Sequence, residues 1–258
     1  MLDIVIMAGG RSRRMQSDIP KVLIECGGIP MIIRILKQIK LFDPNAVYVI
    51  VNPQTHDIIK NKIEEYDVSK RLNIEYSIQE VPLGTGHAIQ SLFKNNINYI
   101  DSDVLIINGD MPLITYKTLY KIYREYILSN SRVSLVSCEL DNPFGCGRII
   151  QNVSNEFIKI VEEKDCTDKE RDIKKVNVGI YVIQMGLLKE NIFKISNNNK
   201  QNEYYLTDLF EIIKNDYLEE GLKINVIEMD KERHYEVLGA NTKDELINLE
   251  KYIDNILV

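Results

Sequence analysis

The sequence predicts an α/β fold built on a mixed, mostly parallel central sheet with helices on both faces. Short segments rich in valine and isoleucine alternate with longer segments whose apolar residues recur at three- and four-residue spacing, the period of one helix face. Two short segments, residues 2–7 and 104–108, are nearly continuous in apolar residues, which is typical of strands covered on both faces. Alternating strands and helices require crossover connections, and these favour a parallel sheet.

In the first half of the chain, four strands are expected with helices between them. The predicted strands cover residues 2–7, 46–51, 72–78 and 104–108. The predicted helices cover residues 30–42, 55–66 and 86–95. This order corresponds to repeated βαβ units, which bring the carboxyl ends of the strands to one edge of the sheet.

After Thr115 the pattern changes to strands that follow one another closely. The predicted strands here cover residues 132–140, 147–151, 157–163 and 176–184, and some are expected to be antiparallel. Helical spacing returns at residues 206–221 and 242–256, and residues 196–202 form a polar loop. No internal repeat and no linker rich in Gly, Ser or Pro interrupts the chain, so residues 1–258 are expected to form a single domain.

The composition is that of an ordinary globular protein of 258 residues, with 45% hydrophobic and 27% charged residues. Its formal net charge of −6 argues against nucleic acid as a partner. No apolar run approaches the ~20 residues of a membrane span, and no basic leader precedes the first strand. The four cysteines form no C-x-x-C pair, so neither a zinc site nor a disulfide framework is expected. These features favour a cytoplasmic location.

The segment IVIMAGGRSRRM, residues 4–15, ends the first predicted strand in two glycines and then presents three arginines. In open α/β sheets ligands bind at the carboxyl ends of the strands, where Gly9 and Gly10 lie. Glycine lets backbone N–H groups approach a ligand closely, and arginine grips phosphate with two N–H groups. Lys21 follows as a compact positive charge. These residues predict a polyphosphate site, with a solvent-exposed basic turn as the alternative.

Two familiar phosphate-binding motifs do not account for this segment. The pattern G-x-x-x-x-G-K-[ST] does not occur in the chain. The segment GTGHAI, residues 84–89, begins like the dinucleotide fingerprint G-x-G-x-x-G, but it ends in Ile89. Since no G-x-G follows the first strand either, a nicotinamide-dependent dehydrogenase has little support.

The segments MAGGRSRRM and DIPKVL together resemble the signature A-G-G-x-G-T-R-M, followed by P-K, of the sugar-phosphate nucleotidylyltransferases. Further segments follow in the order found in N-acetylglucosamine-1-phosphate uridylyltransferases: IQEVPLGTGHAI, LIINGDMPLI, DNPFGCGRI, IVEEKDCT, VNVGIY, NEYYLTDLF and EVLGANTKDEL. The resemblance runs from Ile4 to about Leu249 and is to the N-terminal half of the bifunctional bacterial enzymes. Ser12 and Arg13 replace the usual Gly-Thr, and the hexapeptide repeats of the acetyltransferase half do not occur before the last residue, Val258.

The resemblance implies a Rossmann-like nucleotidyltransferase fold and a reaction. The implied reaction transfers a uridylyl group from UTP to N-acetylglucosamine 1-phosphate, giving UDP-N-acetylglucosamine and pyrophosphate, with Mg²⁺ as cofactor. The implied partners are these small molecules, without nucleic acid or membrane; a homo-oligomer is left open but not indicated. The nearest alternative is a related enzyme that uses another sugar or alcohol phosphate or another nucleotide. An alternative of a different class is a non-catalytic regulatory protein that binds nucleotide sugars.

Two positions match the catalytic residues of the family, and the resemblance assigns both to the triphosphate. Arg14 aligns with the signature arginine, and Lys21 with the P-K lysine. For Arg11 and Arg13 the sequence leaves a phosphate contact and a solvent-exposed position equally open.

Two further positions match the family's magnesium ligands, Asp110 at the end of the strand 104–108 and Asn241 in GANT. Magnesium prefers oxygen ligands and phosphate company, with few protein groups. Taken alone, Asp110 would also suit a turn, and Asn241 would suit the cap of a helix that begins at Thr242.

The remaining matched positions are implied substrate contacts. Gln79, with Gly84 and Thr85, matches the positions that read uracil, since an amide and backbone groups can pair with its donor and acceptor edge. Met7, Ala8 and Gly9 are implied backbone contacts to the nucleotide, and on the sugar side the implied contacts are Gly147, Glu162, Asn177, Tyr205 and Thr207. The remaining implied substrate contacts are Gly10, Lys21, Asn108, Gly109, Asp110 and Asn241. Alignment alone separates Glu162 from Glu163, and packing in the core is the alternative for Tyr205.

The histidines carry no predicted role. His56, His87 and His234 show no metal-ligand spacing and are expected to be structural.

Overall fold

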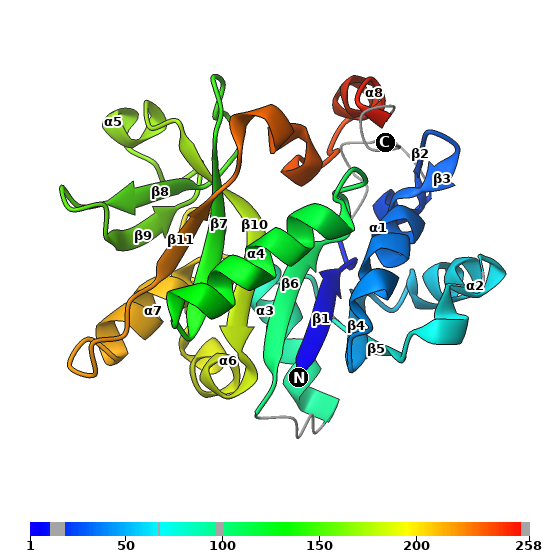
Figure 1. The fold of residues 1–258 in the computed structure, drawn as a ribbon, viewed down its shortest axis with the longest axis horizontal. Helices are drawn as coiled ribbons and strands as arrows, with labels where there is room; N and C mark the ends of the chain where they lie inside the picture. The colour runs from blue at the N-terminus through cyan, green and yellow to red at the C-terminus, as the bar shows by residue number, and fades with distance from the viewer. Residues whose placement is uncertain (11–18, 67, 96–100, 254–258) are drawn as a thin grey trace.

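The computed structural model describes residues 1–10, 19–66, 68–95 and 101–253 and contains a central nine-stranded sheet (Figure 1). Seven strands run across it in the order β11-β7-β10-β6-β1-β4-β5, and β8 and β9 branch from β10. Their bounds are β1 Leu2–Met7, β4 Ala46–Val51, β5 Ile74–Ile78, β6 Asp103–Asn108, β7 Val133–Glu139, β8 Arg148–Gln151, β9 Phe157–Val161, β10 Lys175–Gln184 and β11 Asn225–Glu228.

The strand directions confirm the predicted mixed, mostly parallel sheet. β6, β1, β4 and β5 are mutually parallel, with Ile4 of β1 opposite Val47 of β4 and Leu105 of β6. β11 is parallel to β7, whereas β10 is antiparallel to β6, β7 and β8. The parallel strands therefore end at one edge of the sheet, close to where the predicted nucleotide residues follow them.

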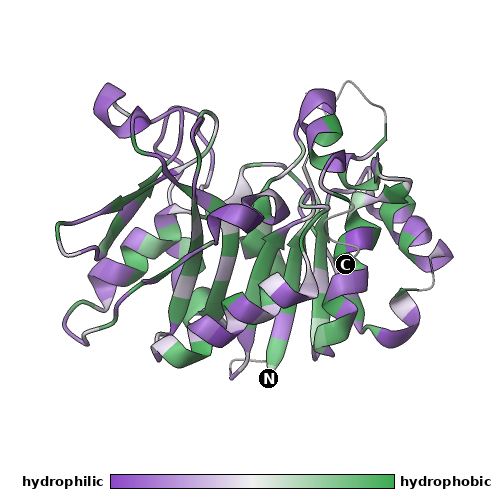
Figure 2. Ribbon diagram, turned by 45° about the horizontal axis from the view of Figure 1, so that its top comes forward, coloured by the Kyte–Doolittle hydropathy of each residue, from purple (hydrophilic) through white to green (hydrophobic). Residues whose placement is uncertain are grey.

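Helices cover both faces of the sheet, as expected. One face carries α1 Met31–Ile39, α2 His56–Glu65 and α4 Tyr116–Ser129, and the other carries α3 Thr85–Leu92, α6 Met185–Asn191 and α7 Asp208–Asp216. β1 alternates between the two cores, because Ile4 and Ile6 pack with the first group of helices and Val5 with the second. Figure 2 shows the strands as apolar and the outward sides of the helices as polar.

The C-terminal part of the described chain packs beside an early hairpin. α8 Lys243–Glu250 places Leu246 and Leu249 against Cys26 and Met31 in a third apolar cluster. Cys26 belongs to the hairpin formed by β2 Glu25–Cys26 and β3 Ile29–Pro30. In Figure 1 α8 and this hairpin lie side by side at the end of the molecule toward which β1 points. This packing brings residues just before α8 close to Lys21.

Several elements were not predicted from the sequence. The longest described helix, α4, was missed because exposed apolar residues on the same helix obscure its buried stripe of Leu119, Ile122 and Tyr126. These exposed residues are Tyr120, Ile127 and Leu128. The sequence prediction also omitted α6, β11, the β2–β3 hairpin, and the single helical turn α5 Asp168–Arg171, which Thr167 caps. The predicted helices at 206–221 and 242–256 begin later than expected, at Asp208 and Lys243. Among the described residues, every helix is too short or too polar to cross a membrane.

Candidate functional site

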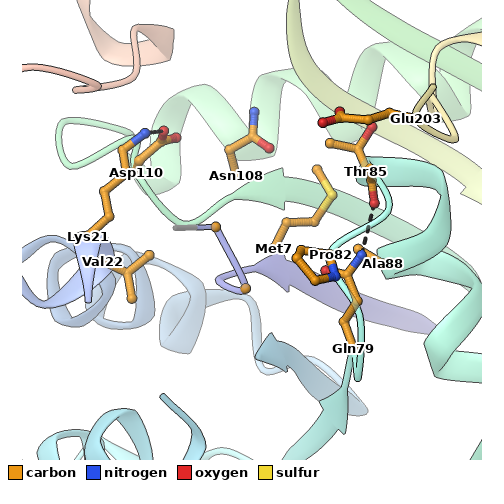
Figure 3. Close-up of a pocket in the computed structure, with 13 residues that line it drawn as sticks. Met7, Lys21, Val22, Gln79, Pro82, Thr85, Ala88, Asn108, Asp110 and Glu203 are labelled. Atoms are coloured by element: carbon orange, nitrogen blue, oxygen red, sulfur yellow. Dashed lines mark hydrogen bonds and ion pairs between the residues drawn. The ribbon is translucent and has the colours of Figure 1, made fainter. Parts of the chain in front are cut away.

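Two adjoining cavities open at the carboxyl edge of the parallel strands. The first has a volume of about 260 Å³ and lies where β1, β5 and β6 end. It is called the nucleotide pocket below, after the predicted nucleotide contacts that line it. It is lined by Met7, Gly9, Gly10, Lys21, Val22, Gln79, Pro82, Gly84, Thr85, Ala88, Asn108, Asp110 and Glu203. Figure 3 shows Lys21 and Asp110 on one side of this pocket and Gln79, Thr85 and Glu203 on the other.

The turn after β1 is fixed by a side chain that sequence reasoning missed. Asn52 is buried after β4, and its Nδ2 donates to the Gly9 carbonyl at 3.2 Å, while the Ala8 N–H donates to the Ile50 carbonyl at 2.8 Å. A Cβ on Gly9 would lie 3.3 Å from Gln79 Oε1, so a side chain here would crowd the pocket. The residues that follow, including the predicted catalytic Arg14 with Arg11 and Arg13, lie outside the described residues.

Gln79 follows β5, and two neighbours contact the nitrogen of its side-chain amide. Nε2 donates to the Gly84 carbonyl at 3.0 Å and lies 3.2 Å from His87 Nδ1. Burial lowers the pKa of His87, which favours the neutral ring with one acceptor nitrogen. In the tautomer that carries its proton on Nε2, His87 accepts at Nδ1, and both N–H groups of Gln79 are used within the protein, so Oε1 is the atom left to accept a hydrogen bond. His87, expected to be merely structural, therefore orients Gln79.

The loop after Gln79 is tied to a segment from much later in the chain. Gly86 N donates to the Tyr204 carbonyl at 2.7 Å, and Tyr204 N donates to the Leu83 carbonyl at 2.7 Å. Gly84 has φ +111°, and a Cβ there would lie 2.5 Å from the Tyr204 carbonyl oxygen, so glycine is required. This tie also brings Glu203, which carried no prediction, to the wall of the nucleotide pocket.

The second cavity has a volume of about 390 Å³ and adjoins the first. It is called the sugar pocket below, after the predicted sugar contacts that line it. The two share Met7, Thr85, Asn108 and Asp110. The sugar pocket contains the predicted residues Gly147, Glu162, Asn177, Thr207 and Asn241, together with Cys138, Cys146, Gly179, Tyr181 and others. The structure thus gathers residues from positions 7 to 241 around one continuous hollow.

The two neighbouring glutamates after β9 have different surroundings. Glu162 lines the sugar pocket, and Thr207 Oγ1 donates to its Oε1 at 2.9 Å. Burial, reinforced by nearby Asp165, raises the pKa of Glu162. Glu163 instead pairs with the buried Arg148 at 2.8 Å and accepts from Gly145 N at 3.0 Å. Glu162 is therefore the glutamate available to a bound ligand.

Lys21, Asp110 and Asn241 meet at the junction of the two pockets. Lys21 Nζ forms an ion pair with Asp110 Oδ2 and donates to Asn241 Oδ1 at 2.7 Å. The alternative role of Asn241 as a helix cap is wrong, because Thr242 is the N-cap of α8 and its Oγ1 accepts from Glu245 N at 3.2 Å. A Cβ on Gly239 would lie 3.1 Å from Asp110 Oδ1, so the backbone also packs closely around this carboxylate.

The oxygens of Asp110 and Asn241 suit a divalent cation of the kind that prefers oxygen ligands. The ammonium of Lys21 contacts one oxygen of each side chain, so this position already accommodates a positive charge. One carboxylate and one amide beside a phosphate pocket match the sparse protein ligation typical of Mg²⁺. Within the described ranges, no cluster of three or more His, Cys, Asp or Glu side chains offers a stronger metal site.

Three described residues among the predicted contacts do not line either pocket. Ala8 and Gly109 make backbone hydrogen bonds next to the nucleotide pocket. The Gly109 N–H donates to the Met7 carbonyl at 3.0 Å. Tyr205 is buried, and burial and the nearby Asp165 raise its pKa, which agrees with the packing alternative for this residue. Contacts of these three residues with a ligand stay predictions.

Comparison with known protein families gives a match to the model described as the MobA-like NTP transferase domain, over residues 4–149. A protein of Acanthamoeba polyphaga mimivirus called "Probable UDP-N-acetylglucosamine pyrophosphorylase" is 39% identical over 255 residues, which cover 99% of this chain and 96% of that protein. The "Bifunctional protein GlmU" of Caldanaerobacter subterraneus subsp. tengcongensis is 35% identical over 96% of this chain. The chain spans about half the length of this bifunctional relative, 50%.

Among solved structures, the chain resembles a putative glucose-1-phosphate thymidylyltransferase from Bacillus anthracis, with a TM-score of 0.70 and 19% identity. The match covers 97% of this chain and 94% of that one. At this level of identity the likeness concerns the fold, and it confirms the predicted α/β architecture with its mixed sheet.

Proposed function

Since the chain belongs to the MobA-like NTP transferase family, we propose that it transfers a uridylyl group from UTP to N-acetylglucosamine 1-phosphate, giving UDP-N-acetylglucosamine and pyrophosphate. The observation that carries the proposal is the pair of adjoining pockets with Lys21, Asp110 and Asn241 at their junction. The mimivirus relative, whose printed name is that of a UDP-N-acetylglucosamine pyrophosphorylase, supports the choice of substrates. A cytoplasmic, single-domain enzyme is part of this proposal.

In this reaction the sugar-phosphate oxygen attacks the α-phosphorus of UTP, and pyrophosphate leaves. The protein's task is to hold two anions in line and to offset their charge. The nucleotide pocket would hold the base against Gln79 and the phosphates beside Gly9, Gly10 and Lys21. The sugar pocket would hold the acceptor so that its phosphate meets the α-phosphate at the junction.

Lys21, together with a cation held by Asp110 and Asn241, would offset the negative charge of the phosphates at the junction. The Lys21 ammonium lies 2.7 Å from Asn241 Oδ1 and pairs with Asp110, so only a short movement would bring it to a phosphate oxygen. Asp110 and Asn241 would hold a magnesium ion, which when bound supplies positive charge and a template for phosphate oxygens. Arg14, outside the described residues, would contact the triphosphate.

The proposal is tested by incubating the purified chain with UTP, N-acetylglucosamine 1-phosphate and MgCl₂ and measuring pyrophosphate release. Parallel reactions contain N-acetylgalactosamine 1-phosphate, glucose 1-phosphate or a nucleotide other than UTP. We expect the highest kcat/KM for UTP with N-acetylglucosamine 1-phosphate, and mass spectrometry of the product should show UDP-N-acetylglucosamine. Preference for another pair would agree with membership of the family but would contradict the proposed substrates. Release of no pyrophosphate from any pair, with nucleotide sugar still bound, would favour the regulatory alternative.

Base selection is expected to depend on Gln79. With its two N–H groups used by Gly84 and His87, Oε1 can accept the N3–H of uracil, whereas the corresponding nitrogen of cytosine is itself an acceptor. Removing a group that pairs with a substrate edge costs about 1–3 kcal/mol of discrimination. Gln79→Ala should therefore lower the ratio of kcat/KM for UTP over CTP by roughly 5–150-fold.

The matched control for this measurement is Gln90→Ala. Gln90 is also a buried glutamine, but its Nε2 donates to the Ile192 carbonyl at 3.0 Å, away from both pockets. Its replacement should leave the UTP/CTP ratio unchanged. An unchanged ratio in Gln79→Ala as well would show that backbone groups, and not Gln79, select the base.

A further inference from the structure

Asn177, a predicted sugar contact, is held at both ends of its amide by residues of its own strand. Gly179 N donates to Asn177 Oδ1 at 3.2 Å, and Asn177 Nδ2 donates to the hydroxyl of Tyr181 at 2.7 Å. With the oxygen toward a backbone N–H and the nitrogen toward a hydroxyl, the amide has one preferred orientation. One N–H and part of the oxygen's acceptor capacity are left for a ligand in the sugar pocket.

The contact between Asn177 and Tyr181 depends on a break in the register of β10. Asn177 lies opposite Ser137 of β7, and Tyr181 lies opposite Leu135, so β10 uses two more residues than β7 over this stretch. In a regular strand, residues four apart are separated by about 13 Å. The bulge shortens this separation, and bulges commonly redirect side chains beside functional sites.

Gly179 lies within this bulge, at a position that requires glycine. Its φ is +77°, and a Cβ would lie 2.4 Å from Nδ2 of Asn108, a residue shared by the two pockets. The bulge is therefore packed against the wall between the pockets.

The Tyr181 hydroxyl is placed for a role at the site. Tyr181 lines the sugar pocket but is only 2% exposed, and its ring lies 4.7 Å from that of Phe210, centroid to centroid. Phenylalanine would satisfy this packing equally well. Among the described residues, the hydrogen bond given for this hydroxyl is the one that it accepts from Nδ2 of the half-buried Asn177.

We propose that Tyr181 is a positioning residue that fixes the amide of Asn177 for the sugar phosphate and so contributes to recognition of the acceptor substrate. The proposal rests on the proposed function, because it takes Asn177 to be a sugar contact. It goes beyond the proposed function because it assigns a role to Tyr181. In this role Tyr181 acts through Asn177, and it contacts neither the nucleotide nor the metal. Its effect should therefore appear in the KM for the sugar phosphate.

The test is steady-state kinetics of Tyr181→Phe with the sugar 1-phosphate that the unmodified chain uses best. Loss of one hydrogen bond that orients a binding group should raise the KM for that substrate by about 3–10-fold. The KM for UTP and the kcat at saturation should stay within twofold of the unmodified values. A matched control is Tyr126→Phe, which removes a buried hydroxyl bonded to Asp103 Oδ1 at 2.7 Å, and it should leave every KM unchanged.

A double-mutant cycle shows whether Tyr181 acts through Asn177. Asn177→Ala should raise the KM for the sugar phosphate by itself, and adding Tyr181→Phe should then cost little more. A full additional effect of Tyr181→Phe in the Asn177→Ala background would overturn the proposal, as would an unchanged KM in Tyr181→Phe alone. If the chain prefers a sugar other than N-acetylglucosamine, the proposed substrate fails, while the cycle can still be run with the preferred sugar.

Discussion

Lys21→Ala is expected to lower kcat by about 10²–10³-fold, since preorganised charges that meet developing phosphate charge typically contribute that much to the rate. Lys21 is the residue that joins the nucleotide pocket to the Asp110–Asn241 pair, through an ion pair with one and a 2.7 Å hydrogen bond to the other. Its side chain is only 13% exposed, so solvent cations replace it poorly. Initial rates at saturating UTP and sugar phosphate measure the loss.

The loss of rate must be separated from loss of fold. Removing Lys21 leaves the Asp110 carboxylate without its ion-pair partner, and we expect this to lower the free energy of unfolding by about 1–3 kcal/mol. Such a change lowers the Tm but leaves the chain folded at assay temperature. Lys60→Ala, at an exposed position on α2, is the matched control and should change neither quantity. A kcat within threefold of the unmodified chain for Lys21→Ala would remove Lys21 from the catalytic residues.

Asp110→Asn is expected to raise the Mg²⁺ concentration needed for half-maximal rate by at least on the order of tenfold. Even changes behind a metal ligand cost about 10–100-fold in metal affinity, and this substitution would neutralise the carboxylate of the proposed site. Asn241→Ala should shift the requirement in the same direction. Titration of MgCl₂ at fixed UTP measures both shifts. Asp230→Asn, which breaks the exposed pair with Lys121, is the control and should produce no shift.

A shared ion also predicts how the two changes combine. Because both side chains would act on one ion, Asp110→Asn with Asn241→Ala should lose less than the sum of the two single losses. Binding of Mn²⁺, followed by electron paramagnetic resonance with a non-hydrolysable UTP analogue present, gives a readout that does not depend on turnover. Additive losses, or unchanged Mn²⁺ binding in either single variant, would contradict a shared site.

The sequence predicts best those features that repeat locally. Residues 46–51 are a continuous apolar run and residues 2–7 are nearly so, and the structure places β4 and β1 at those residues. The 14-residue helix α4 buries Leu119, Ile122 and Tyr126 at helical spacing, but exposed apolar residues on its outer side hide that spacing in the sequence. The sequence shows which residues are apolar, whereas the packing of neighbouring helices and strands decides which of them stay exposed.

The same division applies to the site. Lys21 and Asp110 each follow a recognisable segment, but their meeting depends on packing across 89 positions of the chain. The support of Gln79 by His87 and of Asn177 by Tyr181 left no sequence signal, because both depend on side-chain directions. Glu203 was likewise missed, since only the tie between Tyr204 and Gly86 brings it to the pocket. The family resemblance indicated which residues belong to the site, and the structure shows which neighbours hold them in place.

The hydrogen bond between Lys21 and Asn241 joins residues 220 positions apart, and this separation bears on how the site is completed during synthesis. The glycine-rich segment is made first and leaves the ribosome long before Asn241 has been translated. Contacts that close such long stretches of chain form late, because their entropy cost must be met before they contribute stability. A nascent chain could thus have the β1–β4–β5 part of the sheet in place while its junction still lacked one of its two oxygen donors. Assembly of the junction therefore has to wait until the segment that carries Asn241 has been made and has packed beside Lys21.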